Sequence, residues 1–176
     1  IVVADQPGRS NILARFRDVG IAIDPKDRNV NRLVELVKEQ EFNGYAYDGA
    51  EASFELLARR TLGTVPDYFR CTSFRVIDER RWNAKGDLVT LSEATVRIDS
   101  GGDQEMTVAE GNGPVNALDR ALRKALEQEF PALRQVHLED YKVRVLSSGD
   151  GTAAKVRVLI ESSDGRDVWG TVGVSG

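Results

Sequence analysis

The sequence predicts an α+β protein in which a short helical segment precedes a three-stranded unit that is used twice. Apolar residues in the first 63 positions recur every three to four residues, as on one face of a helix. Most later segments alternate apolar and polar residues, as in a strand with one buried face. The segment from Val96 to Gly113 also resembles the segment from Val158 to Ser175 at a constant offset of 62 residues. Such self-similarity indicates an internal repeat of the βββα type.

Three amphipathic helices are predicted before residue 64. Each carries an apolar stripe with charged residues opposite, and a glycine follows each predicted end. They cover residues 10–20, 29–44 and 50–63.

Six antiparallel strands are predicted after Pro66, because turn clusters such as NAKGD, SGGD and SGDG separate the alternating segments. Trp82 and Trp169 are expected to be core or rim aromatic residues on these strands. The predicted strands cover residues 73–82, 92–99, 104–111, 139–148, 152–164 and 167–175.

A fourth helix is predicted from Pro114 to about Glu129, since proline is favoured at the first position of a helix. No matching helix follows the second strand unit, because the sequence stops at Gly176. It also begins at Ile1 without a methionine, so we expect a fragment of something longer. The expected buried stripe of the helix is Val115, Leu118, Ala121, Leu122, Ala125 and Leu126.

Size and composition limit the possible functions. The 176 residues are 41% hydrophobic and 30% charged, which is enough for one compact domain, or a domain with a small appendage. A net charge of −4 argues against nucleic acid or an anionic membrane as a partner. No apolar run is long enough to span a bilayer, and no signal-peptide pattern opens the sequence. A single cysteine fits a reducing compartment, so a cytoplasmic location is expected.

Catalytic and metal chemistry have few candidate residues. His137 is the one histidine and Cys71 the one cysteine, which argues against a zinc site, a Ser-His-Asp triad and an internal disulfide. His137 is expected to be structural, at the start of a strand, and Cys71 to be buried or half-buried. Asp48, Glu51 and Glu55 could form a metal-binding carboxylate group, but the pattern favours ordinary charged residues on a helix surface.

The segment GNGP at residues 111–114 leads directly into the fourth helix. Unpaired N–H groups at a helix N-terminus can hold a carboxylate or phosphate, and glycines let such a ligand approach the backbone. The segment matches neither a Walker motif nor GxGxxG. Residue chemistry alone therefore favours a tight turn over an anion site.

Several motifs resemble bacterial citramalate synthases, which belong to the 2-isopropylmalate synthase and homocitrate synthase group. The resemblance covers essentially the whole chain in order, and the longest motif is specific. The motifs are GRSN (8–11), GAEASFELL (49–57), AEGNGPVNALDRALRKAL (109–126), EDYKVRVL (139–146), GTAAKVRVLIESSDG (151–165) and WGTVGVS (169–175).

The resemblance implies a three-part acyltransferase, with a TIM barrel that condenses acetyl-CoA with pyruvate, a linker and a regulatory domain. Residues 1–63 would then be the helical linker subdomain, and residues 64–176 the regulatory, dimerising domain. The divalent metal and acetyl-CoA would belong to the barrel, so this chain alone is expected to be inactive, with no cofactor and no catalytic residue. In such enzymes the linker reaches toward the barrel, which makes Arg9, Asn11 and Tyr45 or Tyr47 candidates for substrate contact.

The resemblance also implies an effector site for a branched-chain amino acid, with isoleucine expected ahead of leucine, in a homodimer. It places that effector near the strand-to-helix turn and reverses the preference stated above in favour of a functional turn. The alternatives are a purely structural dimerisation module of the same enzyme, or the leucine-sensing domain of a 2-isopropylmalate synthase. The implied effector-binding residues are Gly111, Gly113, Asn116, Leu138, Tyr141, Val145 and Thr152.

Overall fold

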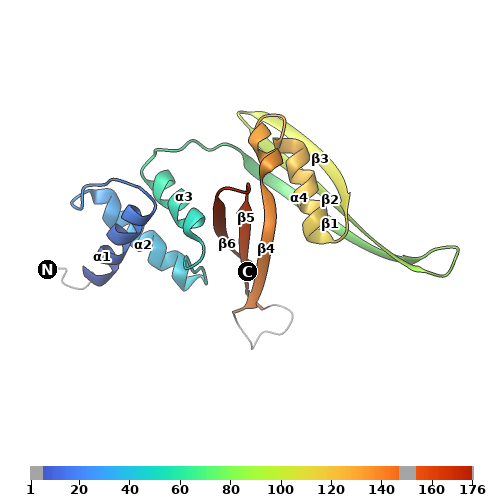
Figure 1. The fold of residues 1–176 in the computed structure, drawn as a ribbon, viewed down its shortest axis with the longest axis horizontal. Coiled ribbons are helices and arrows are strands. Elements are labelled where there is room, and N and C mark those ends of the chain that lie inside the picture. The colour runs from blue at the N-terminus through green and yellow to red at the C-terminus, as the bar shows by residue number, and fades with distance from the viewer. Residues whose placement is uncertain (1–5, 147–153, 176) are drawn as a thin grey trace. The chain divides into compact units, whose positions relative to one another are not determined.

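The computed structural model describes residues 6–146 and 154–175, and in this part of the chain four α-helices accompany two three-stranded antiparallel sheets (Figure 1). This confirms the predicted α+β class and the repeated three-stranded unit. No helix among the described residues is long and apolar enough to cross a membrane. In chain order, the elements are α1 (Gln6–Asp18), α2 (Arg28–Phe42), α3 (Glu51–Thr61), β1 (Arg70–Trp82), β2 (Leu88–Ser100), β3 (Asp103–Gly111), α4 (Pro114–Leu126), a 3-10 helix (Pro131–Gln135), β4 (His137–Val145), β5 (Val156–Ser163) and β6 (Val168–Ser175).

The chain divides into two compact units. One unit combines residues 1–66 with residues 136–176, and the other consists of residues 67–135. The first contains α1–α3 and the sheet β4–β5–β6, whereas the second contains the sheet β1–β2–β3 and α4. The functional boundary after residue 63 stays a prediction.

The three helices of the first unit share one apolar core. Phe16, Leu33 and Phe54 are almost completely buried in it, each from a different helix. Asp27 caps α2 by accepting a hydrogen bond from the backbone N–H of Asn29, which satisfies one of the unpaired donors at the helix start. The predicted 3.6-residue periodicity therefore found the correct buried faces.

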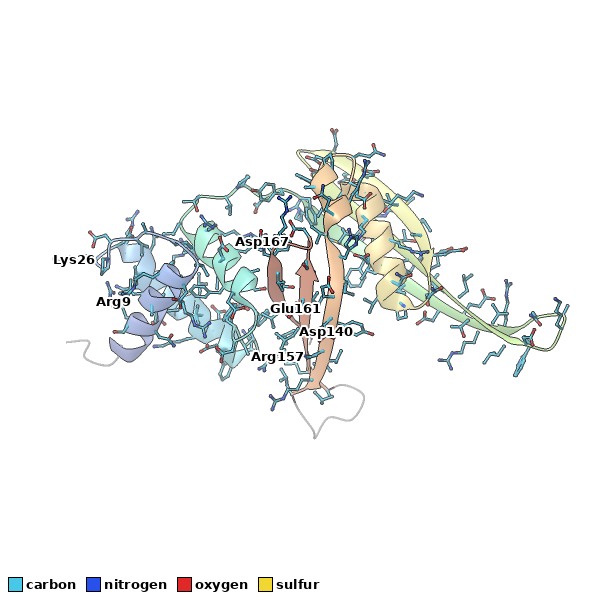
Figure 2. All side chains as sticks on the ribbon, viewed as in Figure 1. Arg9, Lys26, Asp140, Arg157, Glu161 and Asp167 are labelled. Carbon is cyan, nitrogen blue, oxygen red and sulfur yellow. The ribbon has the colours of Figure 1, made fainter. Side chains whose placement is uncertain are left out.

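The sheet of this unit is attached to the helices by backbone contacts. A Cβ on Gly170 of β6 would lie 2.9 Å from the carbonyl carbon of Gly49, and closer still to its oxygen, so only glycine fits. The Ser53 hydroxyl accepts a hydrogen bond of 3.0 Å from the N–H of Val172. Arg157, labelled in Figure 2, donates from Nε to the carbonyl oxygen of Gly44 at 2.5 Å. One face of β4–β5–β6 is thus turned toward the helices.

In the second unit, α4 covers one face of the sheet, mainly over β2 and β3. The β2 side of this core is Ala94, Val96 and Ile98. The Thr107 hydroxyl on β3 donates to the carbonyl of Ala121 at 2.6 Å, which joins strand and helix inside the core. The buried residues of α4 are Ala117, Ala121, Ala125 and Leu126.

Three expectations about individual side chains were wrong. Val115 is 44% exposed and Ala117 is buried instead, because the contact stripe of α4 follows the alanines at four-residue intervals. Trp82 is 71% exposed at the end of β1, so it is not a core residue. Cys71 is exposed because β1 is an edge strand. Trp169 is partly buried on β6, consistent with the prediction.

Candidate functional site

The turn between β3 and α4 is built from glycine for two different reasons. Gly113 has φ +145° and ψ 166°, a backbone region that is essentially restricted to glycine. No atom lies within 4 Å of the Cβ that a side chain would add there. A valine at Gly113 would therefore stay out of the core but would force the backbone out of its native φ. Such a variant does not probe ligand access alone.

Gly111 is constrained by packing instead. A Cβ on Gly111 would lie 2.7 Å from the Cα of Ala117 and closer still to its backbone nitrogen. Real side chains do not approach a backbone so closely, and the neighbour cannot give way without moving the first turn of α4. The absence of a side chain at Gly111 thus lets α4 lie against the end of β3.

Asn116 takes part in the same turn. Its Oδ1 accepts a hydrogen bond of 3.1 Å from the backbone N–H of Asn112. The cap residue Gly113 offers no side chain to the N–H groups at the start of α4, and Pro114 has no N–H to donate. An acceptor at this end of α4 would meet the N–H groups of Val115 and Asn116.

Leu138, Tyr141 and Val145 of β4 lie on one face of the sheet β4–β5–β6. Their partners on β5 are Ser162, Ile160 and Val156, which alternate along that strand and so share a face. Leu138 and Tyr141 are an odd number of positions apart, which would put them on opposite faces of a regular strand. The register shift between Leu138 and Asp140 corrects this parity.

None of the strand residues paired across this face is charged, and Glu139, at the register shift of β4, has no partner on β5. We call this surface the uncharged face. It is turned away from α1–α3, because Val172 of the opposite face packs against the helical core. The charged strand residues Asp140, Arg157 and Glu161, labelled in Figure 2, belong to that opposite face. The uncharged face consists of Leu138, Tyr141, Val143, Val145, Val156, Val158, Ile160, Ser162, Trp169, Thr171, Gly173 and Ser175.

The uncharged face is largely open to solvent at β4. Tyr141 is 49% exposed, and Val143 and Val145 are more exposed than that. A face of this kind can accept an apolar side chain, but its paired residues offer no ionic partner for an ammonium or carboxylate group.

Sequence reasoning missed the β5 and β6 members of this face. The signal was present, since the offset of 62 aligns Val156, Val158 and Ile160 with the core positions Ala94, Val96 and Ile98. That alignment predicts that both triplets lie on corresponding faces of the two sheets.

The seven implied effector residues are distributed over both units. Gly111, Gly113 and Asn116 belong to residues 67–135, and the structure brings these three together in one turn. Leu138, Tyr141 and Val145 belong to the other unit and share the uncharged face. Thr152 lies outside the described residues.

Acidic residues of the helical segment form ion pairs, and the chain has no metal-binding cluster within residues 6–146 and 154–175. No group of three or more His, Cys, Asp or Glu side chains there is placed to hold a metal ion. Asp48 forms an ion pair of 2.6 Å with Arg15, and Glu55 forms one of 2.7 Å with Arg59. Both contacts agree with the expected helix-surface charge.

The linker candidates have partners of their own in the helical segment. Arg9, labelled in Figure 2, donates hydrogen bonds to the Asn31 side chain and to the carbonyl of Pro25. Tyr47 is buried edge-on against Phe54, with ring centroids 6.0 Å apart. Burial raises the pKa of Tyr47, and its electrostatic interactions with Tyr45 and Glu41 raise it further. These contacts give Arg9 and Tyr47 a structural role in the segment.

Comparison with known proteins identifies relatives. Residues 48–176 match the model of the LeuA allosteric (dimerisation) domain. The chain is 55% identical to the (R)-citramalate synthase of Geobacter sulfurreducens and 50% identical to that of Aquifex aeolicus, and each alignment covers 99% of the chain. A probable 2-isopropylmalate synthase of Methanopyrus kandleri is 27% identical over 94% of the chain.

The chain spans about a third of the length of its curated relatives, 33% of the first two citramalate synthases and 31% of the Methanopyrus protein. These matches confirm the resemblance to citramalate synthases that the sequence motifs indicated. The family model covers α3 and every strand of both sheets. This chain therefore belongs to the LeuA allosteric (dimerisation) domain family.

Proposed function

We propose that this chain is the regulatory part of a citramalate synthase. It would form a homodimer and bind a branched-chain amino acid, with isoleucine preferred over leucine. The uncharged face of β4–β5–β6 is the observation that carries the proposal. It presents branched and aromatic side chains to solvent on a sheet whose other face is covered by helices. The identity of 50–55% to citramalate synthases over 99% of the chain supports this parent enzyme over a 2-isopropylmalate synthase.

The proposal names two separate candidate contacts for the effector, one in each unit of the chain. The hydrocarbon side chain of the amino acid would lie against Leu138, Tyr141 and Val145, where burial of apolar area favours binding. In the other unit, the N–H groups at the start of α4 are a candidate site for a carboxylate, because the helix dipole favours negative charge there. Thr152 remains a candidate for the ammonium group or its surroundings.

Regulation would follow from linkage. An effector that binds one arrangement of the domains more tightly than another shifts the population toward that arrangement. In the parent enzyme, a barrel would condense acetyl-CoA with pyruvate in the cytoplasm using a divalent metal, and the regulatory part would lower its rate when isoleucine accumulates. This chain would contribute no catalytic residue and no cofactor site.

A second candidate function is a purely structural dimerisation module. Both glycines of the turn have a backbone or packing reason to be glycine, and this observation favours it. In that case the chain would dimerise but bind no amino acid. A leucine-sensing domain is the third candidate, and it differs from the first only in the preferred ligand.

Calorimetric titration of this chain with isoleucine, leucine and valine separates the candidates. We expect saturable binding, with a lower dissociation constant for isoleucine than for leucine or valine, because the relatives of highest identity named above are citramalate synthases. Preferential leucine binding would support the leucine-sensing alternative. Absence of heat for all three ligands, at protein concentrations where the chain is folded and dimeric, would support the structural module.

We also expect no condensation of acetyl-CoA with pyruvate by this chain alone, at any concentration of divalent metal. The described residues contain no group of three or more His, Cys, Asp or Glu side chains placed to hold a metal ion. The measurement is thiol release, followed with a thiol reagent, against a control without protein. Metal-dependent release above that control would contradict the assignment of catalysis to another part of the enzyme.

A further inference from the structure

The hairpin of β1 and β2 extends beyond the rest of its sheet. Both strands have 13 residues, whereas β3 has nine and pairs with β2 only from Ser92 to Ser100 (Figure 1). The ladder from Glu79↔Leu91 to Trp82↔Leu88 therefore has two strands only. We call residues 79–91 the arm. Two-stranded ribbons are marginally stable by themselves, so an arm of this length needs additional support.

The end of the arm is well ordered by its own hydrogen bonds. The side chain of Asn83 accepts hydrogen bonds of 2.9 Å from the N–H groups of both Lys85 and Asp87. The Asn83 N–H donates to the carbonyl of Asp87, and Gly86 supplies the positive φ that the turn requires. Directly behind this turn, Trp82 and Leu88 face each other across the two strands. They are 71% and 53% exposed, so the arm presents an apolar pair to solvent.

The outer edge of β1 is also unusual. No strand pairs with it within residues 67–135, and its pairing with β2 is regular from Ser73 to Trp82. Exposed edge strands are normally protected by charged side chains, especially Lys, by Pro, by a bulge or by a short length. This stretch is long and has no Pro, Lys or bulge, and its five charged side chains carry both signs, so a second strand with a complementary order of charges can pair with it. Because α4 lies mainly over β2 and β3, it leaves the edge of β1 accessible within its unit.

We propose that β1 of one chain pairs antiparallel with β1 of a second copy, about a two-fold axis at Glu79. This inference rests on the dimer of the proposed function and assigns one of its contacts. Symmetry restricts the choice of register. A two-fold axis perpendicular to a sheet maps each face onto itself, so opposed residues must come from the same face of β1. The axis must then pass through a residue and not between two residues.

The charges of β1 and the exposed side chain of Trp82 together select this axis. An axis at Glu79 places Asp78 opposite Arg80 of the second copy, twice by symmetry, and Val76 opposite Trp82. Opposite charges and aromatic–β-branched pairs both stabilise neighbouring strands. The two Glu79 carboxylates meet at the axis, and Arg81 of each copy lies diagonal to them, opposite Ile77.

Adjacent axes fit less well. An axis at Asp78 would oppose two aspartates and would also place Arg75 opposite Arg81. An axis at Arg80 would oppose two arginines and place Arg75 opposite Lys85. An axis at Ile77 would pair Arg75 with Glu79 and oppose two isoleucines, but it would place Trp82 opposite Thr72 and give the exposed ring no apolar partner.

The relevant charges are available for pairing. Neither Asp78 nor Glu79 nor Arg80 forms an ion pair within residues 6–146 and 154–175. Asp78 uses one oxygen, Oδ1, to accept a hydrogen bond of 2.5 Å from the Ser92 hydroxyl. Its second oxygen remains for Arg80 of the other copy.

A charge exchange tests both the contact and its register. In Asp78→Arg, every 78–80 pair of the homodimer becomes Arg–Arg, and in Arg80→Asp every such pair becomes Asp–Asp. Reversal of two pairs is expected to weaken each homodimer by on the order of tenfold to a hundredfold. In a mixture of the two variants, both pairs are again Arg–Asp, so the heterodimer should form with an affinity close to that of the wild type. Sedimentation gives the dissociation constants, and native mass spectrometry of a 1:1 mixture distinguishes heterodimer from homodimers.

Ser92→Ala is the matched control, since it removes the same hydrogen bond from Asp78 without changing the edge charge. It should dimerise like the wild type, and circular dichroism should show that all variants are folded. If Asp78→Arg and Arg80→Asp each dimerise like the wild type, the β1 contact is wrong, although the chain still forms the proposed dimer. Restoration by mixing Arg75→Glu with Glu79→Arg, and not by the first mixture, would overturn the register. A monomeric wild-type chain would contradict the proposed dimer itself.

Discussion

Replacing Gly111 by alanine is expected to lower the free energy of unfolding by about 3 kcal/mol, a large effect for the addition of one methyl group. The added Cβ would overlap the backbone of Ala117 at the first turn of α4, where neither strand nor helix can move without disturbing the core around Ala121. For a chain of this length, such a loss corresponds to a fall in melting temperature of roughly 6–12 °C. Thermal unfolding followed by circular dichroism measures it.

Gly173→Ala is the control for Gly111→Ala, because Gly173 occupies the equivalent position in the internal repeat, 62 residues later. No atom lies within 4 Å of a Cβ at Gly173, and this glycine does not have a positive φ. Its substitution should change the free energy of unfolding by no more than about 0.5 kcal/mol. Equal losses at the two positions would show that α4 does not rest on the backbone at Gly111 as described.

Tyr141→Ala is expected to weaken isoleucine binding by roughly tenfold to a hundredfold. Removing an aromatic wall from an apolar contact costs on the order of 1.5–3 kcal/mol, and each 1.4 kcal/mol is a factor of ten in affinity. Tyr141 is half exposed in this chain, so its loss should change the melting temperature little. Calorimetric titration of wild type and variant with isoleucine gives the ratio of dissociation constants.

Lys142→Ala provides the matched comparison at the neighbouring position. Lys142 lies on the opposite face of β4, where its ammonium pairs with Asp140 at 3.3 Å, and its side chain is largely exposed. Its removal should leave the dissociation constant of isoleucine unchanged. A Tyr141→Ala chain that binds isoleucine as tightly as the wild type would exclude the uncharged face as the effector site.

Local pattern was sufficient for most of the fold. Periodicity and turn residues correctly predicted four helices, six antiparallel strands and the repeat, because one-sided burial imposes a period of 3.6 or 2 on any amphipathic element. The limits of elements were less accurate. The helix predicted to reach Glu129 ends at Leu126, and the strand predicted from residue 152 begins at Val156.

Periodicity does not reveal which of two faces is covered, or how far a neighbour extends along a strand. Val115 was expected to be buried because it is apolar, but the helix rests on small alanines that allow close approach to the sheet. Trp82 was expected in or near a core, but β3 and α4 do not reach the end of the hairpin that carries it. Both errors have the same cause, since burial depends on the distant segment that packs against a residue.

The sequence by itself determined the α+β class, the repeated three-stranded unit and the family, because these depend on local patterns and on motifs that are contiguous in the chain. Only the tertiary structure decided that Leu138 and Tyr141 share a face, since a register shift at one residue changes the parity of the strand. It also separated the roles of two glycines that look alike in GNGP, one restricted by its φ and the other by the backbone of Ala117. The sequence shows only that both positions are glycine. The physical reason differs between them, and it depends on the backbone angles and the neighbouring atoms in the folded chain.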